Sequence, residues 1–197
     1  MAQSAHLDTF TRDNLPPQEM WPEFINLDRL GYPERLNCAS ELLDRNVAEG
    51  RGDKPALVSP TTSWTYAELA EKVNRIANVL VDDFGLKPGN RVLLRFPNTP
   101  MMTAVYFAVL KAGGVVVATM PLLRAKELAV ITDKAELSLA ICDHRLSDEM
   151  ELTRKRTDRL EQILYSGGEG DDTLEARMER ASSEFTACDT AADDVCL

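Results

Sequence analysis

The chain has 197 residues, a hydrophobic fraction of 44% and a charged fraction of 27%, which are ordinary values for one domain with or without a small appendage. Its formal net charge of −10 argues against a nucleic-acid-binding protein, because such proteins usually present a basic patch. Most of the excess negative charge lies from Asp143 to Leu197, and an acidic segment of this kind is usually a solvated surface.

The N-terminus lacks both the basic and the apolar region of a signal peptide. The four cysteines show no C-x-x-C pair and no histidine at ligand spacing; they are Cys38, Cys142, Cys188 and Cys196. We therefore expect a cytoplasmic protein with reduced thiols and no metal site. The apolar stretch 104–123 is near membrane-spanning length, but Lys111, Gly113–Gly114 and Pro121 divide it, so we expect no membrane span.

Residues 1–34 are mixed in character and contain several prolines, with Trp21, Phe24 and Tyr32 as candidate aromatic anchors. We interpret this segment as an extended arm that lies on the domain formed by residues 35–197. A helical pattern begins at Arg35 and ends at Gly50 and Gly52. Its apolar stripe consists of Leu36, Ala39, Leu43 and Val47.

A hairpin and a long helix are expected next. Short runs at 56–58 and 63–65 flank the turn residues 59–62, which is typical of a β-hairpin. Thr65 and Glu68 have the spacing of a capping box, so a helix should begin at Tyr66, and Gly85 should end it. The predicted inner face of this helix consists of Leu69, Val73, Ile76, Leu80 and Phe84.

The stretch 91–121 predicts a strand, a helix and a second, parallel strand. Val-rich runs at 92–94 and 115–117 are typical of buried strands, and the apolar segment between them is long enough for a helix. A parallel crossover of this kind requires helices that cover the sheet. The expected core residues of this unit and of the following strand are Val92, Leu94, Val105, Val109, Val116, Leu139 and Ile141.

The alternation of strands and helices continues towards the C-terminus. In order, we expect a helix after Pro121, a strand at 137–142, a charged helix at 145–159, a strand at 162–165 and a short helix at 173–182. Residues 193–197 are expected to begin a further strand. The whole pattern predicts an α/β fold with a largely parallel, doubly wound sheet and flanking helices.

Chemistry-bearing residues are scarce. The glycine-rich segment 165–170 follows a predicted strand, but Glu169 and its acidic neighbours would repel a phosphate, so we interpret it as a surface loop. His144 follows Asp143, yet adjacent side chains need not face each other, so the pair does not indicate a catalytic dyad. The residues by themselves indicate an α/β domain without a visible active site.

Two motifs carry a resemblance that goes further. Trp64–Leu69, with the sequence WTYAEL, resembles the first core motif of the AMP-forming adenylating enzymes, which include acyl- and aryl-CoA ligases, adenylation domains and luciferases. Leu110–Gly114, with the sequence LKAGG, and the later Pro121 resemble the second motif. The resemblance covers essentially residues 35–197. The arm and the segment after it are most similar to benzoate-type ligases, anthranilate–CoA ligase in particular.

The resemblance implies the N-terminal subdomain of the adenylate-forming ligase fold. In that family the phosphate-binding loop follows the strand that would begin at Val195, so the resemblance implies a chain that is cut before this loop. The adenine, magnesium and ribose sites and the catalytic lysine of the family would lie further on. We therefore expect neither catalytic nor metal-ligating residues in this chain, and no activity of the chain alone.

For the parent enzyme, the resemblance implies an acid–thiol ligase with ATP, Mg²⁺ and coenzyme A as cofactors. It would activate a carboxylic acid, such as the aromatic acids benzoate or 2-aminobenzoate, to an acyl-adenylate and transfer the acyl group to coenzyme A. Two alternatives stay open. One is an adenylation domain that loads a carrier protein. The other is a stand-alone interaction or dimerisation module, which would form a homodimer.

The resemblance also implies a coenzyme A site. In family members the loop after the second motif and the end of the next strand approach the coenzyme A nucleotide. The corresponding residues here are Thr119, Met120, Pro121, Leu122, Arg124 and Arg145. The two arginines are the expected phosphate ligands, because a guanidinium binds phosphate through two hydrogen bonds. Some relatives have arginine in place of Leu122, and the alternative is that Arg124 only begins a solvated helix.

Overall fold

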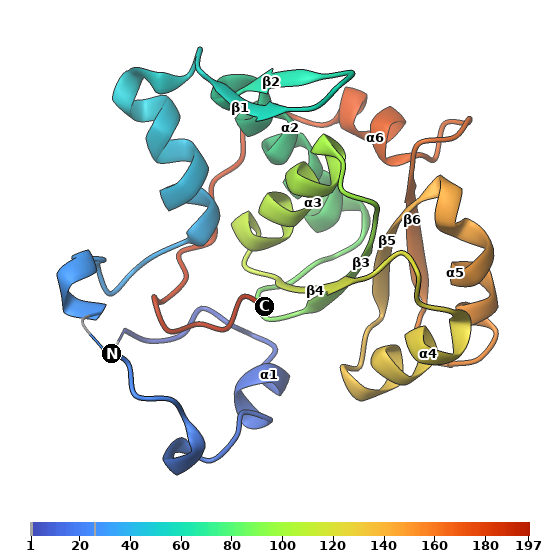
Figure 1. The fold of residues 1–197 in the computed structure, drawn as a ribbon, viewed down its shortest axis with the longest axis horizontal. Helices are drawn as coiled ribbons and strands as arrows, with labels where there is room; N and C mark the ends of the chain where they lie inside the picture. Colours follow the sequence, from blue (N-terminus) through green and yellow to red (C-terminus); the bar gives the residue numbers. More distant parts are fainter. Residues whose placement is uncertain (1, 26) are drawn as a thin grey trace.

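The computed structural model describes residues 2–25 and 27–197, so Met1 and Asn26 of the expected arm lie outside the described residues. Within the described part of the chain, four strands form one parallel sheet in the order β4-β3-β5-β6 (Figure 1). The strands are β3 (Arg91–Arg95), β4 (Val115–Thr119), β5 (Leu139–Asp143) and β6 (Gln162–Ser166). The predicted parallel sheet is therefore confirmed.

Helices cover both faces of this sheet, which confirms the doubly wound arrangement (Figure 1). One face is covered by α2 (Tyr66–Asn78), α3 (Pro100–Lys111) and α6 (Leu174–Arg180), and the other by α4 (Ala125–Lys134) and α5 (Ser147–Arg154). Side chains alternate between the faces, as the strand geometry requires. Val92 and Leu94 belong to the core under α2 and α3, whereas Leu93 belongs to the core under α4 and α5.

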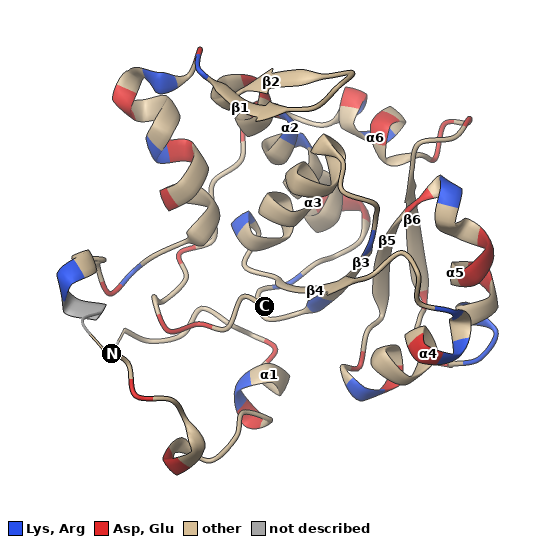
Figure 2. Ribbon diagram, in the orientation of Figure 1, with Lys and Arg blue, Asp and Glu red and all other residues tan. Residues whose placement is uncertain are grey.

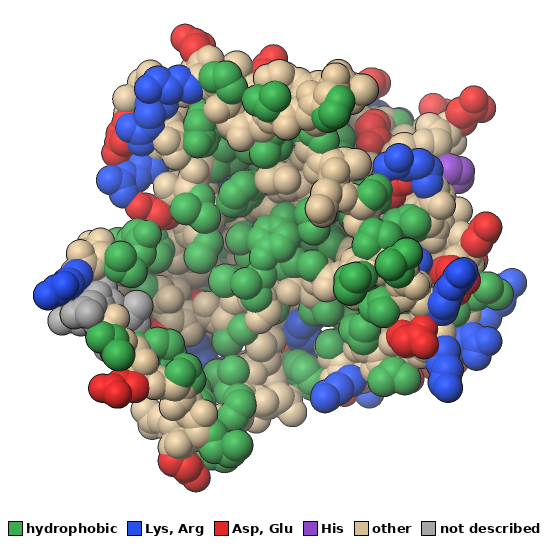
Figure 3. Space-filling model, in the orientation of Figure 1, with side chains coloured by type: hydrophobic (Ala, Val, Ile, Leu, Met, Phe, Trp, Pro, Cys, Tyr) green, Lys and Arg blue, Asp and Glu red, His purple; other side chains and the backbone are tan. Residues whose placement is uncertain are grey.

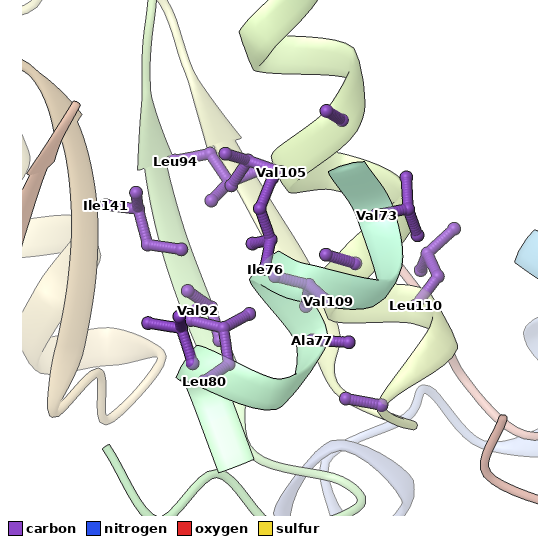
Figure 4. Close-up of a cluster of buried hydrophobic side chains, with 14 of the residues drawn as sticks. Val73, Ile76, Ala77, Leu80, Val92, Leu94, Val105, Val109, Leu110 and Ile141 are labelled. Atoms are coloured by element: carbon purple, nitrogen blue, oxygen red, sulfur yellow. The ribbon is translucent and has the colours of Figure 1, made fainter. Parts of the chain in front are cut away.

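The larger core lies between the sheet and the pair of helices α2 and α3 (Figure 4). Side chains from α2 and the turn after it, such as Ile76 and Leu80, pack against Val105 and Val109 of α3 and against Val92 of β3. Each of the seven predicted core residues is at most 4% exposed. Burial of a side chain of this size stabilises the fold by roughly 1.5–3 kcal/mol, so this layer supplies much of the driving force for folding.

The predicted hairpin and helix cap are also present. β1 (Pro55–Val58) and β2 (Ser63–Thr65) pair in antiparallel fashion as a small separate sheet. The Thr65 hydroxyl accepts a hydrogen bond from the Glu68 N–H at 3.2 Å, and the Glu68 carboxylate accepts one from the Thr65 N–H at 2.8 Å. Because both halves of the capping box form, α2 begins at Tyr66 as predicted. It continues as a π-helical turn, Val79–Asp83, before Gly85.

The helix predicted to begin at Arg35 begins later in the structure. Leu36 lies outside it, because its N–H bonds to the Thr190 carbonyl at 2.9 Å. The Asn37 side chain then accepts hydrogen bonds from the N–H groups of Ala39 and Ser40 and so caps a helix that begins at Cys38. The segment includes the π-helical stretches Ser40–Asp44 and Val47–Arg51.

The predicted charged helix over 145–159 is too long. A 3-10 turn at His144–Leu146 precedes α5, and α5 ends at Arg154. The chain turns away there because the buried Thr157 hydroxyl donates a hydrogen bond to the Asp133 carboxylate at the end of α4. Side-chain charge alone does not reveal a contact of this kind.

The contacts that hold the arm on the domain differ from the predicted ones. It contains α1 (Phe10–Asp13) and 3-10 turns at Gln18–Met20 and Leu27–Leu30. The three aromatic residues predicted to be anchors are instead 42–62% exposed; they are Trp21, Phe24 and Tyr32. Attachment comes from Asp8, which forms an ion pair with Arg91 of β3, and from Phe10, whose ring lies 4.4 Å from the Arg91 guanidinium.

The C-terminal segment is not a strand, which corrects the prediction for 193–197. The Cys196 carbonyl accepts a hydrogen bond from the N–H of Val116 in the edge strand β4. No ladder follows in the described residues, because Asp194 turns the chain back through hydrogen bonds with Ala191. Its side chain also bonds to Ser4 and Ala5, which ties the two ends of the chain together.

Charge and apolar surface are separated in the molecule. Figure 2 shows many charged residues on α4, α5, α6 and the helical segment that begins at Cys38, whereas α3 carries only Lys111 at its end. Figure 3 shows hydrophobic side chains gathered over α3. Among the described residues, the helices are all too short or too polar to cross a bilayer.

Candidate functional site

The strand order creates a crevice between β3 and β5. These neighbouring strands are followed by helices on opposite faces of the sheet, since α3 covers one face and α5 the other. In open α/β sheets, ligands bind outside the carboxyl ends of the strands at such a switch point. The residues at this place are Arg95 at the end of β3, Asp143 at the end of β5 and the loop 120–124 after β4.

A cavity of about 290 Å³ lies at this switch point. Four of the six residues predicted for the coenzyme A site line it, namely Pro121, Leu122, Arg124 and Arg145. The structure places the other two differently. The Thr119 hydroxyl bonds to the Leu94 carbonyl at 3.0 Å, and Met120 is 63% exposed. The structure therefore brings the two predicted arginines into one cavity although they come from different loops.

Arg95 is a residue of this cavity that the sequence reasoning missed. It is 2% exposed, and its guanidinium donates to the carbonyls of Met120, Pro121 and Leu123 at 2.9–3.3 Å. Burial lowers its pKa, and its buried Nε has no hydrogen-bond partner. The signal was the arginine that follows the apolar run Val92–Leu94 at the carboxyl end of β3, where a buried charge requires dedicated acceptors.

The exposed arginines of the cavity are already paired with carboxylates. Arg124 donates to Glu149 at 2.9 Å, and Glu149 also accepts the N–H of Ala125 at the start of α4. The Ala125 N–H and then Arg124 hold the pKa of Glu149 below its usual value. Arg145 binds the Asp143 carboxylate through two nitrogens at 2.7 and 2.8 Å, which lowers the pKa of Asp143. A phosphate at this site would compete with these carboxylates.

The described residues contain no metal-binding cluster. Across residues 2–25 and 27–197, no group of three His, Cys, Asp or Glu side chains is placed to hold a metal ion. His144 packs edge-on against Tyr165, with ring centres 6.2 Å apart. The glycine-rich loop is exposed, and its Gly167 N–H donates to the Glu175 carboxylate at 2.8 Å. That donor is therefore not free to bind a phosphate.

A larger groove of about 660 Å³ lies elsewhere, beside α2 and α6. Its charged lining contains four carboxylates and two basic side chains: Glu68, Glu71, Glu175, Glu179, Lys72 and Arg75. The Lys72 ammonium lies 4.9 Å from the Trp64 ring centre. The excess of negative charge makes this groove a poor site for nucleotide phosphates.

The two sequence motifs lie on neighbouring helices. The first motif starts α2 and the second ends α3, and these helices pack side by side (Figure 1). Lys111 is 3% exposed, and its ammonium donates to Asp44 at 2.7 Å and to Asn74 of α2 at 2.6 Å. Lys111 therefore ties α3 to α2 and to the segment before it. Trp64–Leu69 and Leu110–Gly114 do not line the cavity at the switch point, whereas Pro121, further along the second motif, does.

Comparison with known proteins supports this architecture. Residues 43–197 match the family model described as AMP-binding enzyme. Benzoate–CoA ligase from Thauera aromatica is 31% identical over 165 residues, which cover 84% of this chain and 31% of that protein. The chain therefore spans less than a third of that relative. A subunit of linear gramicidin synthase from Brevibacillus parabrevis is 29% identical over 125 residues, 64% of this chain and 2% of that protein.

Solved structures show the same fold. The crystal structure of the anthranilate CoA ligase AuaEII, in complex with anthranoyl-AMP, matches 85% of this chain and 31% of that chain, with a TM-score of 0.78 and 23% identity. The parallel sheet flanked by helices is thus the N-terminal subdomain of the adenylate-forming ligase fold, as the two motifs implied. On its match over residues 43–197, the chain belongs to the family of AMP-binding enzymes.

Proposed function

We propose that residues 35–197 are the N-terminal subdomain of an acid–thiol ligase and that residues 1–34 are its arm. The observation that carries the proposal is the match to AMP-binding enzymes over 43–197, with 31% identity to benzoate–CoA ligase. In the first step, the substrate carboxylate attacks the α-phosphorus of ATP and pyrophosphate leaves. In the second, the sulfur of coenzyme A attacks the acyl carbon and AMP leaves.

Adenylation serves to create a leaving group. An oxide ion is a poor leaving group, whereas AMP leaves readily, and bound Mg²⁺ would neutralise charge on the phosphates. An aromatic acid such as benzoate or 2-aminobenzoate is the proposed substrate. The name of the relative from Thauera aromatica supports this choice, whereas the anthranilate ligase supports only the fold at its level of identity.

The cavity at the switch point is the proposed place for the coenzyme A nucleotide, as predicted for Thr119, Met120, Pro121, Leu122, Arg124 and Arg145. Arg124 and Arg145 suit this role because their side chains are 76% and 68% exposed and lie on one cavity. Each holds one carboxylate, so a phosphate would bind by displacing Glu149 or Asp143 or by using the remaining guanidinium N–H groups. Arg95 would hold the loop 120–124 in place.

We expect Arg124→Ala and Arg145→Ala each to weaken coenzyme A binding about 5-fold, because each removes one exposed, charge-assisted contact to phosphate. The measurement is calorimetric titration of the 197-residue chain with coenzyme A. In an enzyme that contains these residues, the same changes should raise the KM for coenzyme A and leave adenylate formation unchanged.

Arg159→Ala is the matched control for these variants. Arg159 is also an exposed arginine in an ion pair, 2.9 Å from Glu136, but it lines a different cavity. Its removal should leave coenzyme A affinity unchanged. Equal affinities of the Arg124 and Arg145 variants and the unaltered chain would contradict the proposed site.

The chain alone should catalyse no ATP–pyrophosphate exchange with a panel of benzoates and short fatty acids. Adenylation requires groups that hold the ATP phosphates and orient the carboxylate for in-line attack. In this chain the Gly167 N–H of the glycine-rich loop already donates to the Glu175 carboxylate, and acidic residues surround the loop. Exchange above a no-enzyme blank that is abolished by a substitution within this chain would show that a site had been missed.

The second candidate is an adenylation domain that transfers the acyl group to a carrier protein. The similarity to the gramicidin synthase subunit favours it. Comparing free coenzyme A with a phosphopantetheinyl carrier protein as acceptor, in an enzyme that contains these residues, separates the two. Accumulation of acyl-CoA supports the ligase, whereas acylation of the carrier alone supports the second candidate.

A further inference from the structure

Two cysteines from opposite ends of the chain meet beside β4. Cys38 is the first residue of the helix that Asn37 caps, and Cys196 lies in the C-terminal segment whose carbonyl bonds to Val116. Both side chains line the same small cavity of about 60 Å³, and both pack against the main core. Figure 1 shows the C-terminus next to the start of β4. Neither thiol is fully buried.

The surroundings of Cys38 favour its thiolate form. Its position at a helix N-terminus favours negative charge, and Cys196 lines the same small cavity. The hydrogen bond from Cys196 lowers the pKa of Cys38, and the same contact raises the pKa of Cys196. Burial raises the pKa of Cys142 to about 12 and also raises that of Cys188. The reactive thiol therefore has a second thiol as its immediate neighbour.

We propose that Cys38 and Cys196 form a redox-active pair that closes reversibly to an intramolecular disulfide when the chain meets a low-molecular-weight disulfide such as oxidised glutathione. The Cys38 thiolate attacks one glutathione sulfur, the glutathione disulfide bond breaks, and one glutathione thiolate leaves. Cys196 then loses its proton and attacks the Cys38 sulfur, which expels the second glutathione. Two protein thiols are oxidised and one glutathione disulfide is reduced to two thiols.

A metal site is a poorer explanation of the pair. In the described part of the chain, no third His, Cys, Asp or Glu side chain completes a metal-binding group with the two thiols. Closure would link the helix that begins at Cys38 to the segment beside β4. The bond would join residues far apart in the sequence, and a long loop of this kind restricts the unfolded chain strongly.

The test is equilibration of the 197-residue chain in glutathione buffers, followed by alkylation of the free thiols and peptide mass spectrometry. We expect one cross-linked pair of peptides that contains Cys38 and Cys196, two fewer alkylated cysteines and full reversal by dithiothreitol. Oxidation should raise the midpoint of thermal unfolding by roughly 5–10 °C. Absence of the cross-link at every ratio of oxidised to reduced glutathione would overturn the proposal.

Three cysteine variants sharpen the result. Cys196→Ser should trap Cys38 as a mixed disulfide with glutathione, and Cys38→Ser should slow modification of Cys196 at least about 10-fold. Cys188→Ser is the matched control and should leave the Cys38–Cys196 cross-link unchanged. A cross-link that involves Cys188 or Cys142 in place of this pair would also overturn the proposal.

A second measurement does not depend on folding of the variants. Phenylarsine oxide bridges two neighbouring thiols with loss of water, so the unaltered reduced chain should bind one equivalent and protect Cys38 and Cys196 from alkylation. Binding without protection of these two cysteines, or no binding, would count against the pair.

Discussion

Replacing Gly113 with alanine should lower the free energy of unfolding by about 4 kcal/mol, through backbone strain and a steric clash together. Gly113 has a φ of +78°, which L-residues rarely adopt. A Cβ at this position would lie 2.7 Å from the Cys188 sulfur and 3.2 Å from the Pro88 Cβ. Neither neighbour moves freely, because the Cys188 N–H bonds to the Lys111 carbonyl at 2.8 Å and the proline ring is rigid.

Gly50→Ala is the matched control for Gly113→Ala. Gly50 has the same φ of +78°, but no heavy atom lies within 4 Å of the position of its Cβ. Its replacement should therefore cost only the backbone term, about 1–2 kcal/mol. Urea denaturation followed by circular dichroism measures both variants. Equal losses would contradict the close packing of Cys188 and Pro88 on Gly113.

Arg95→Met should lower the free energy of unfolding by about 3 kcal/mol. Methionine keeps much of the apolar length of the side chain but removes the donors that the carbonyls of Met120, Pro121 and Leu123 accept. Hydrogen bonds from a charged donor contribute more than neutral ones, and these three half-buried carbonyls would lose their donor. Hydrogen exchange should also quicken at the amides of the loop 120–124, because Arg95 no longer holds it.

Arg159→Met is the control for Arg95→Met. Arg159 forms an exposed ion pair with Glu136, and such pairs contribute less than about 1 kcal/mol. Denaturation and hydrogen exchange are measured on both variants. A small loss at Arg95 without faster exchange in the loop 120–124 would show that the loop does not depend on this guanidinium.

Regular structure in this chain was predictable from local pattern. The β-branched runs of β3 and β4 and the apolar segment between them identify a parallel crossover, and Thr65 with Glu68 marks the start of α2 within one turn. These predictions succeed because each depends on residues that are close together in the sequence, either one hydrophobic period or one capping contact apart. The predicted core residues are buried for the same reason.

The candidate site was predictable only in part. The resemblance indicated Arg124 and Arg145, and the structure places both on one cavity. Arg95 was missed, because its acceptors lie 25 or more residues further on and no local pattern connects them. The pairing of Arg124 with Glu149 and of Arg145 with Asp143 likewise depends on how loops from different strands meet.

The fold class, the main elements and the family could be inferred from the amino-acid sequence, since these depend on hydrophobic period and on short motifs. Tertiary structure alone decided which residues from distant segments touch. It left the aromatic residues of the arm exposed, ended α5 at Arg154 and placed Cys38 and Cys196 on one small cavity. A sequence pattern indicates which side chains are buried, whereas the packing of the whole chain decides which residues each of them contacts.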